Sequence, residues 1–332
     1  MNAPNVFSVS EESFRNFMGH VRYYMTRNKL PYHNYFHALD VMQTCFVFVE
    51  SLEASAYVTE LESFGLVIAA LCHDLDHPGL TNQYQVNRQT PLALRFNDAS
   101  VLENMHAATC FQILRKTGCD IFSGLEKSDQ ATIRKVIIGC IINTDMTYHF
   151  VLKTDLHNMI NKTKEEGGIL NFMRGDKDRD VLLKTLLHVA DISNPCKKFE
   201  LSKKWSDAVI KEFFYQGDLE KKEGLSVSMG CDRTTTAQET LSLNFCDFIV
   251  APFFFSLYGL FPKLLPVINV MVANREEWHR RAILMIKAKT FDGEDPDMLR
   301  AAELVKWDKR VTVFKESHAS TVGENDEAEV GA

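Results

Sequence analysis

Residues 63–72 read SFGLVIAALC, and this stretch decides the fold. Its side chains are apolar on nearly every side of a helix, which indicates a helix in the centre of a hydrophobic core. The pair Pro78-Gly79 stops the helical pattern. No segment of the chain shows the regular apolar–polar alternation of a β-strand. We therefore predict an all-α fold, built as a compact multi-helix single domain.

Similar apolar stretches occur along most of the chain. They predict further helices over residues 14–25, 39–49, 101–114, 131–142, 181–190 and 205–214. Pro31 and Asn34 are typical start signals for the helix over 39–49. We expect one domain over residues 1–315. Residues 316–332 are small, polar and acidic, which predicts a disordered tail.

The composition of the 332-residue chain agrees with a helical protein and excludes some functions. Only 16 glycines and 9 prolines are present, so few residues break helices. The formal net charge of −7 argues against nucleic acid as a partner and against a polybasic membrane anchor. An apolar stretch over residues 248–272 is interrupted by prolines, so it predicts two buried helices rather than a transmembrane segment.

The cysteines indicate the compartment. Eight are scattered through the chain without any Cys-x-x-Cys pair, which argues against a zinc ribbon and against a compact disulfide framework. Residues 1–20 carry charges and no long apolar run, so no signal peptide is expected there. We predict reduced thiols and an intracellular, cytoplasmic location.

Histidines and acidic residues follow apolar stretches at several points. His33 and His37 are four residues apart and would share one face of a helix; taken alone, the pair is more typical of structural histidines. His73 and Asp74 directly follow the core helix. Burying such groups is costly unless they are paired or bind a cation. Imidazole with carboxylate is a common ligand set for zinc or manganese.

Three further acidic or hydroxyl positions allow two interpretations each. Asp191 ends the helix over 181–190 and either delivers a metal ligand or bonds to the turn that follows. Glu103 either completes a capping box with Ser100 or orients metal-bound water. Thr144, followed by Asp145, has the same ambiguity between a cap and a water ligand.

The joint pattern favours a metal site. His37, His73, Asp74 and Asp191 come from three separate predicted helices, and two imidazoles with two carboxylates suit Zn²⁺. The second oxygen of Asp74 could hold a harder ion such as Mg²⁺ or Mn²⁺. No Gly-x-Ser-x-Gly elbow and no phosphate-binding Gly-x-x-x-x-Gly-Lys loop competes with this interpretation.

The chain resembles the catalytic domain of the class I 3′,5′-cyclic nucleotide phosphodiesterases. The run over residues 73–82, HDLDHPGLTN, fits the family's His-Asp signature. Four more motifs recur in family order: Tyr-His-Asn at 32–34, Val-Leu-Glu-Asn at 101–104, Thr-Asp-Met at 144–146, and Ala-Asp with Ser-Asn-Pro over 190–195. The similarity extends over roughly residues 15–285. A protozoan, kinetoplastid-type member is suggested, cut from a longer protein with regulatory domains.

The resemblance implies a deep pocket with a binuclear metal site. It implies a zinc ion on His37, His73, Asp74 and Asp191, and a second ion, magnesium or manganese, on Asp74. His77, Glu103 and Thr144 would hold waters around that second ion. His33 would be the general acid, which protonates the O3′ leaving group while a metal-bridging hydroxide attacks phosphorus in line.

The resemblance also implies a base pocket. The residues expected to contact the nucleotide are Tyr32, Asn194, Val209, Phe213, Ser242 and Phe245. The family nearly always has glutamine where this chain has Ser242, and serine is too short for paired hydrogen bonds to a purine edge. Gln238, one helical turn earlier, is a possible substitute. We expect weaker nucleotide affinity with intact metal chemistry.

The expected function is hydrolysis of cyclic nucleotides, with cAMP as the first candidate substrate and cGMP as the second. The products would be 5′-nucleoside monophosphates, and the reaction would terminate cyclic-nucleotide signalling. Two alternatives stay open: a catalytically impaired domain that senses cyclic nucleotides or acts as a scaffold, and another HD-type phosphohydrolase. The sequence does not indicate an oligomeric state.

Overall fold

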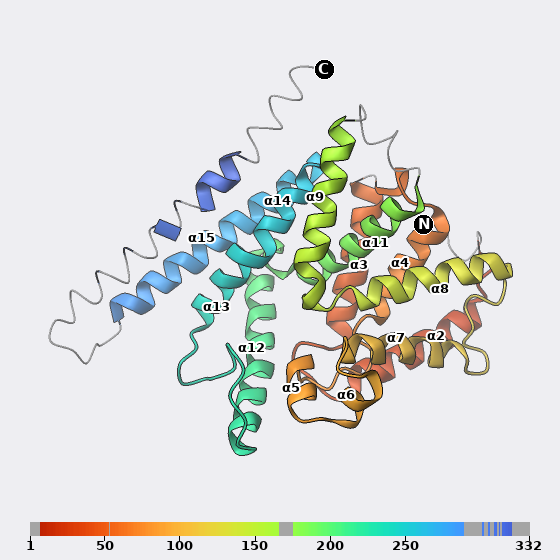
Figure 1. Cartoon of the computed structure of the whole chain (residues 1–332), viewed down its shortest axis with the longest axis horizontal. Helices are drawn as coiled ribbons and strands as arrows, with labels where there is room; N and C mark the ends of the chain where they lie inside the picture. The colour runs from red at the N-terminus through yellow and green to blue at the C-terminus, as the bar shows by residue number, and fades with distance from the viewer. Residues whose placement is uncertain are drawn as a thin grey trace. The chain divides into compact units, whose positions relative to one another are not determined.

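The computed structural model describes residues 7–52, 54–165, 175–288, 301, 305, 309–310, 312 and 314–320. Within this part of the chain every regular element is a helix, which confirms the all-α prediction (Figure 1). The chain divides into two compact units. Unit 1 comprises Met1–Ile192 and Ala208–Asp232, and unit 2 comprises Ser193–Asp207 and Arg233–Ala332.

Unit 1 contains the apolar helix from which the fold was predicted. Its helices are α2 (Glu11–Thr26), α3 (Tyr35–Ser51), α4 (Glu60–Cys72), α5 (Asn82–Asn87), α6 (Pro91–Phe96), α7 (Val101–Leu114), α8 (Lys127–Ile142), α9 (His149–Glu165) and α11 (Asp176–Asp191). The helix α12 (Phe199–Lys222) has its first part in unit 2 and its remainder in unit 1. Short 3₁₀ turns lie at Ala54–Ala56 and Met146–Tyr148.

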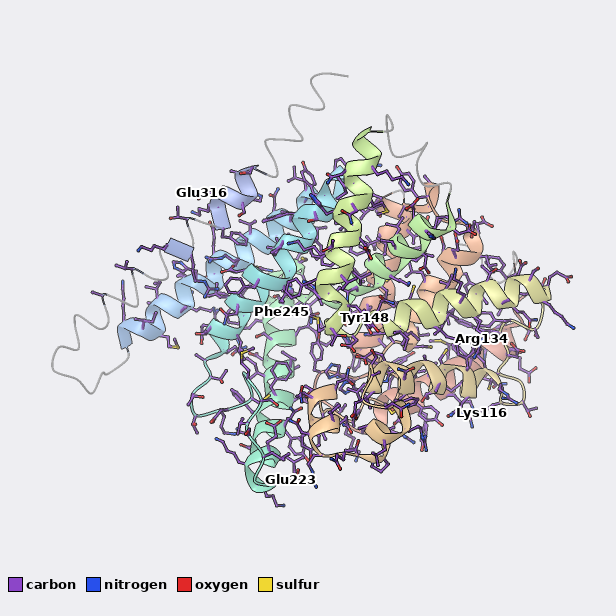
Figure 2. The ribbon with its side chains drawn as sticks, viewed as in Figure 1. Lys116, Arg134, Tyr148, Glu223, Phe245 and Glu316 are labelled. Atoms are coloured by element: carbon purple, nitrogen blue, oxygen red, sulfur yellow. The ribbon has the colours of Figure 1, made fainter. Side chains whose placement is uncertain are left out.

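The core of unit 1 forms where α4 packs against α3, α8 and α11. The side chains of α4 are buried on nearly all sides, as the sequence predicts. Gly65 permits the close approach of α8, since a Cβ atom at this position would lie 3.0 Å from a methyl carbon of Val136. Helix α7 packs on α8, where the guanidinium of Arg134 lies 4.0 Å from the ring centroid of Phe111. Arg134 is labelled in Figure 2.

Hydrogen-bonding side chains fix where the helices begin. Asn34 caps α3 by accepting from the backbone of Phe36 and His37, so the expected start signal operates. Of the two interpretations of Glu103, the capping box with Ser100 is not formed. Ser100 has φ 41° and ψ 54° and makes no capping bond, because this left-handed conformation is not the extended one that a capping side chain needs.

Unit 2 is also helical. It contains the turn Asn194–Cys196, α13 (Gln238–Phe245), the π-helical turn η4 (Cys246–Val250), α14 (Ala251–Tyr258), the turn Pro262–Leu264 and α15 (Leu265–Ala288). One of its apolar clusters joins Leu243 on α13 to Trp278, Ala282 and Ile286 on α15.

The predicted tail over residues 316–332 is described only in part. Residues 314–320 are helical, so the helix continues five residues into the stretch expected to be a disordered tail, and residues 321–332 lie outside the described part. Phe314 is buried, and the guanidinium carbon of Arg275 lies over its ring, 4.9 Å from the ring centroid.

By length and composition, one described helical stretch, Gln238–Tyr258, meets the criterion for crossing a membrane. The core helices of soluble proteins meet the same criterion, so the observation is weak.

Candidate metal centre

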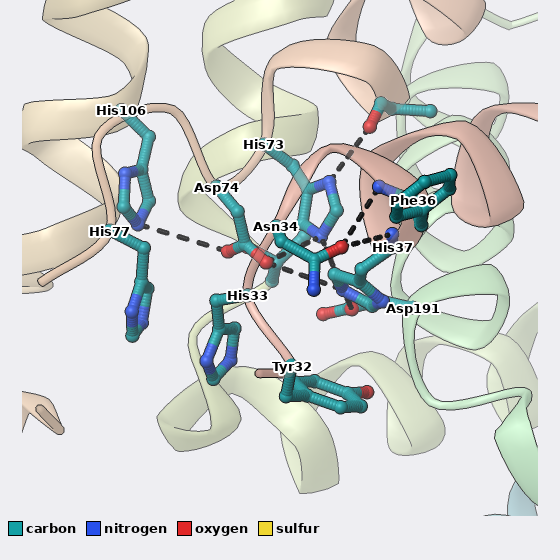
Figure 3. A network of polar contacts seen from close by, with 12 residues as sticks. Tyr32, His33, Asn34, Phe36, His37, His73, Asp74, His77, His106 and Asp191 are labelled. Atoms are coloured by element: carbon teal, nitrogen blue, oxygen red, sulfur yellow. Dashed lines mark hydrogen bonds and ion pairs between the residues drawn. The ribbon is translucent and has the colours of Figure 1, made fainter. Parts of the chain in front are cut away.

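Four side chains from three helices meet at one point in unit 1. His37 lies in the first turn of α3, and Asp191 is the last residue of α11. His73 and Asp74 directly follow α4 (Figure 3). The helix ends therefore deliver all four residues, which together form a candidate metal-binding group.

The donor atoms of this group are almost evenly spaced. Nε2 of His37 lies 3.3 Å from Nε2 of His73, and both nitrogens lie 3.1–3.2 Å from Oδ1 of Asp191. Oδ2 of Asp74 lies 3.3 Å from the first nitrogen and 3.2 Å from the second. Donors about 2.0–2.1 Å from a tetrahedral ion are about 3.3 Å apart. The spacing therefore fits a zinc-sized cation.

The tautomer of His73 also fits a metal ligand. Its Nδ1 donates to the backbone oxygen of Ala70 at 2.8 Å, so Nε2 is the nitrogen that faces the cluster and that would bind a cation on losing its proton. Hydrogen bonding of the other ring nitrogen is the usual way in which proteins orient a ligating histidine.

Opposite charges shift the pKa values inside this buried group. Burial alone would lower the pKa of His73, but the carboxylates of Asp74 and Asp191 raise it well above its ordinary value. Burial alone would raise the pKa of Asp191, but His73 and His37 hold it below its ordinary value. The carboxylates therefore stay ionised at neutral pH, as metal ligands must.

A second group shares Asp74. Its other oxygen, Oδ1, lies 3.8 Å from Nε2 of His106, and these two residues with His77 form a further candidate metal group. Nδ1 of His106 donates to the backbone oxygen of Leu75 at 2.7 Å, which leaves Nε2 of the neutral ring as an acceptor facing a carboxylate. Two acceptors that face each other need a cation or a water between them. Sequence reasoning missed His106, although it lies three residues after Glu103 on α7.

Glu103 and Thr144 lie at helix ends in the same unit. Glu103 accepts from Nδ2 of Asn82 at 2.9 Å. Burial raises the pKa of Glu103 to about 7, and the charge of Asp145 adds to this shift. Thr144 is buried and donates its hydroxyl to the backbone oxygen of Ile141 at 2.8 Å, an interaction of the end of α8.

His33 is held by a residue that the sequence analysis did not identify. Its Nδ1 lies 2.6 Å from Oε2 of Glu212 on α12, and Oε1 of the same carboxylate accepts the backbone N–H groups of Tyr32 and His33 at 2.7 and 2.9 Å. The His33 ring stacks on His77 with 3.8 Å between centroids. The expectation that His33 and His37 share a helix face is wrong, because α3 begins at Tyr35.

Glu212 is ionised in this setting. Burial alone would raise the pKa of its carboxyl group, but the hydrogen bonds from His33 and from the backbone keep that pKa below its ordinary value. An ionised Glu212 accepts a proton-bearing Nδ1, so Nε2 of His33 is the atom left to exchange protons with a substrate.

The residues expected in the base pocket belong to both units. Val209 and Phe213 are in unit 1, and Asn194, Ser242 and Phe245 are in unit 2. Within unit 2, Oγ of Ser242 lies 3.0 Å from Oγ of Ser206.

The amide of Gln238 is already engaged within unit 2. It donates to Oγ of Ser206 at 3.0 Å and to Oδ1 of Asp207 at 2.6 Å. Its amide nitrogen is therefore held by these two side chains, which argues against Gln238 as a substitute for the missing glutamine.

A helical fold with buried His–Asp groups that could hold metal ions is typical of metal-dependent hydrolases, and the comparisons specify the family. The profile described as 3′5′-cyclic nucleotide phosphodiesterase matches residues 32–271, so the chain belongs to this family. Its relatives include 3′,5′-cyclic-AMP phosphodiesterase, isoform F, of Drosophila melanogaster, which is 38% identical over 269 residues, or 81% of this chain. They also include the 3′,5′-cyclic-nucleotide phosphodiesterase regA of Dictyostelium discoideum, 36% identical over 312 residues, or 92% of this chain.

This chain spans 40% of the length of the first curated relative and 38% of the second. Solved structures agree with the fold. The phosphodiesterase domain of the Salpingoeca rosetta rhodopsin phosphodiesterase superimposes with a TM-score of 0.80 at 35% identity, covering 86% of this chain and 85% of that one. LmjPDEB1 in complex with IBMX has a TM-score of 0.78 at 31% identity and covers 84% and 82%. The second likeness is consistent with a kinetoplastid-type member.

Proposed function

We propose that this chain hydrolyses 3′,5′-cyclic nucleotides to 5′-nucleoside monophosphates, with cAMP as the preferred substrate and cGMP as a second. The observation that carries the proposal is the spacing of 3.1–3.3 Å among the donor atoms of His37, His73, Asp74 and Asp191. The names of the relatives support the substrate class, since both include cyclic-nucleotide phosphodiesterase activity.

Zinc is the ion proposed for the four-residue group, because two imidazoles and two carboxylates at tetrahedral spacing suit it. Magnesium or manganese is proposed at the free oxygen of Asp74, with His77, Glu103 and Thr144 holding its waters. Two divalent cations would lower the pKa of a shared water and neutralise charge that develops on the phosphoryl oxygens.

His33 is proposed as the general acid. Expulsion of the O3′ alkoxide requires a proton in the transition state, and an imidazole whose Nδ1 is hydrogen-bonded to Glu212 can supply it from Nε2. Ring stacking on His77 and the two backbone bonds to Glu212 fix the position of this group. Precise orientation is what makes such a proton transfer effective.

Base recognition is proposed for the residues that the family resemblance indicates. Val209 and Phe245 would contact the two faces of the base, with Tyr32, Asn194 and Phe213 nearby. Ser242 stands where the family has a glutamine that makes two hydrogen bonds to the base. The hydroxyl of Ser242 is hydrogen-bonded to that of Ser206. We expect weak discrimination between adenine and guanine, because a hydroxyl can donate to one and accept from the other.

The proposal further places the enzyme in the cytoplasm, where it would terminate cyclic-nucleotide signalling. All eight cysteines lie in the described residues, and each is buried and outside any disulfide. Reduced thiols are typical of proteins in the cytosol.

One experiment separates the proposed activity from its alternatives. Purified protein is supplied with cAMP, cGMP or a 5′-nucleotide, with and without a chelator. We expect turnover of the cyclic nucleotides that the chelator abolishes and that added Zn²⁺ with Mg²⁺ restores. Turnover of the 5′-nucleotide alone would favour another HD-type phosphohydrolase. Binding of cyclic nucleotide without any turnover would favour a sensing or scaffolding domain.

A further inference from the structure

One buried face of α12 carries two polar residues that the proposed chemistry does not use. Gln216 and Glu220 are one helical turn apart and have exposed fractions of 1% and 0%. They follow Glu212 at the same spacing, so the three residues share one face of the helix. Glu212 holds the backbone of His33, and the other two hold two different loops of unit 1.

Glu220 binds the loop that follows α12. Its Oε2 accepts the backbone N–H of Ser228 at 2.7 Å, and its Oε1 accepts the hydroxyl of the same serine at 2.6 Å. The loop lies tightly against the helix, since a Cβ atom on Gly217 would clash with the backbone oxygen of Cys231. A buried carboxylate needs several donors to offset its lost hydration, and these two bonds supply part of that need.

Gln216 links Glu220 to a second loop through hydrogen bonds of its side-chain amide. Its Nε2 donates to Oε1 of Glu220 at 2.9 Å and to Oγ1 of Thr81 at 3.1 Å. Its Oε1 accepts the backbone N–H of Thr81 at 2.8 Å. The direction of every bond is fixed, because the carboxylate of Glu220 only accepts and the amide nitrogen of Gln216 therefore must donate.

The neighbour of Thr81 reaches the candidate metal centre. Asn82 donates its amide to Oε1 and Oε2 of Glu103 at 3.2 and 2.9 Å. Its own Oδ1 accepts the backbone N–H of Leu102 at 2.9 Å, which fixes the orientation of the amide. A continuous series of hydrogen bonds and one peptide link thus joins Ser228 to Glu103. We call Ser228, Glu220, Gln216, Thr81, Asn82 and Glu103 the α12 relay.

We propose that Glu220 is a positioning residue that sets the affinity of the second divalent cation, acting through the α12 relay on Glu103. The inference rests on the proposed function, in which Glu103 holds waters of that cation. Residues that orient groups around a metal typically change its affinity about 10–100-fold when they are replaced. Glu220 bonds to Ser228 and Gln216 rather than to the ligands named above, so its effect must travel through Gln216 and Thr81.

The test compares Glu220→Gln with a variant that exchanges the two side chains, Q216E/E220Q. In Glu220→Gln a new amide N–H faces the donors of Ser228 or Gln216, so one bond of the relay is lost. In the exchanged variant, the new carboxylate at position 216 accepts from Thr81 and from the new amide at position 220. The oxygen of that amide accepts from Ser228, so all the bonds reform with the polarity inverted. The exchanged variant has no carboxylate at position 220, so it would not recover if the fold simply requires a carboxylate there.

A matched control removes a carboxylate from the end of the same helix. Glu223, labelled in Figure 2, accepts from the hydroxyl of Tyr84 at 2.8 Å and lies 3.0 Å from Nε of Arg88, at α5 and its C-terminal cap. It therefore contacts α5 without belonging to the α12 relay. Glu223→Gln tests whether loosening α5 alone affects the metal.

The measurement is Mn²⁺ binding to zinc-loaded protein, followed by electron paramagnetic resonance, with zinc content measured separately. We expect Glu220→Gln to bind Mn²⁺ about tenfold more weakly with zinc retained, and we expect the exchanged variant and Glu223→Gln to bind within about threefold of wild type. Unchanged Mn²⁺ affinity in Glu220→Gln, or no recovery in the exchanged variant, would overturn the proposal.

A second variant covers the case in which Glu220→Gln does not fold, and the activity of the wild type separates this proposal from the proposed function. If Glu220→Gln does not fold, Ser228→Ala removes only one hydroxyl from the α12 relay. Mn²⁺ binding weakened about fivefold supports the proposal, and binding within about threefold of wild type overturns it. The titration needs no turnover. Wild-type protein that binds Mn²⁺ but hydrolyses no cyclic nucleotide would contradict only the proposed function. An active wild type, together with unchanged Mn²⁺ affinity in Glu220→Gln, would contradict only the proposed role of the α12 relay.

Discussion

Nδ1 of His33 lies 2.6 Å from Oε2 of Glu212, although the two residues are 179 positions apart in the chain. The other oxygen of Glu212 accepts the backbone N–H groups of Tyr32 and His33. One carboxylate therefore fixes the tautomer of the ring and the position of its backbone together. A general acid at His33 depends on both.

The first prediction concerns Glu212→Gln. The amide that replaces the carboxylate carries an N–H group that faces either the His33 ring or the backbone donors, so either the favourable tautomer or the backbone hydrogen bonds are lost. We expect kcat for cAMP to fall about 100-fold, a typical contribution of a positioned general acid. Zinc content should stay at the wild-type level, because Glu212 is outside the four-residue group. Steady-state kinetics with metal analysis provides the check.

A double-variant comparison shows whether Glu212 acts through His33. His33→Asn should retain metal and lose leaving-group protonation. If the two residues work as a unit, H33N/E212Q is no slower than His33→Asn alone, since the second change removes nothing further. Multiplied losses in the double variant would contradict the role assigned to Glu212.

The second prediction concerns metal binding by Asp191→Ala. Its Oδ1 lies 3.1 Å from Nε2 of His37 and 3.2 Å from Nε2 of His73, so removing it opens the group on one side. We expect zinc loss and a fall in turnover of at least about 100-fold. Asp180→Asn is the control on the same helix, because Asp180 pairs with Lys184 at 2.6 Å and is outside the four-residue group. Activity of Asp191→Ala within tenfold of wild type would be incompatible with a ligand.

The sequence contained enough information to find the helices and the four clustered residues. Residues 63–72 form the last ten positions of α4, and the predicted helix over 101–114 coincides with α7. His73, Asp74 and Asp191 were found because each follows or ends an apolar helix, where an uncompensated charge is costly. Helix periodicity and desolvation are local signals, so a single sequence displays them.

The parts that were missed depend on tertiary structure. Glu212 looks like any polar residue of an amphipathic helix, and only the folded chain brings it to His33. The sequence could not decide between the two interpretations of Glu103 for a related reason. The capping-box motif is present, but the chain enters α7 with Ser100 in a left-handed conformation. Local motifs record what a segment can do alone, and packing decides which of these possibilities is used.

The third prediction concerns Ser242→Gln. A longer amide at this position can make two hydrogen bonds to a purine edge, which the serine hydroxyl is too short to do. We expect KM for the preferred nucleotide to fall about tenfold to 100-fold, with kcat changed little. Initial rates over a range of cAMP and cGMP concentrations test this.

Ser242→Ala is the matched control for that substitution. It removes the hydroxyl shared with Ser206 at 3.0 Å without adding a new group. Its KM should stay within about threefold of wild type if serine contributes little to affinity. An unchanged KM in Ser242→Gln would count against a base contact at this position.

The fourth prediction concerns acid stability and a buried histidine pair. Nδ1 of His149 lies 2.9 Å from Nε2 of His188, whose Nδ1 donates to the backbone oxygen of Asn143 at 3.0 Å. The backbone bond leaves Nε2 of His188 as an acceptor, so His149 donates. Burial lowers the pKa of His149 to about 4, and repulsion by His188 and Lys153 adds to the shift.

The direction of the pH effect follows from these proton affinities. Between about pH 6.5 and pH 4 the unfolded chain protonates His149 while the folded chain keeps it neutral, so the free energy of unfolding falls as the pH falls through this window. One such group contributes at most about 1.4 kcal/mol per pH unit.

In His149→Asn the amide nitrogen occupies nearly the position of Nδ1, so the bond to His188 is kept and the titration is removed. Urea unfolding at pH 7 and pH 5 should show a smaller acid loss in His149→Asn than in wild type or in His157→Asn, which changes an exposed histidine of α9. Equal losses in all three proteins would mean that His149 is not the group that senses acid.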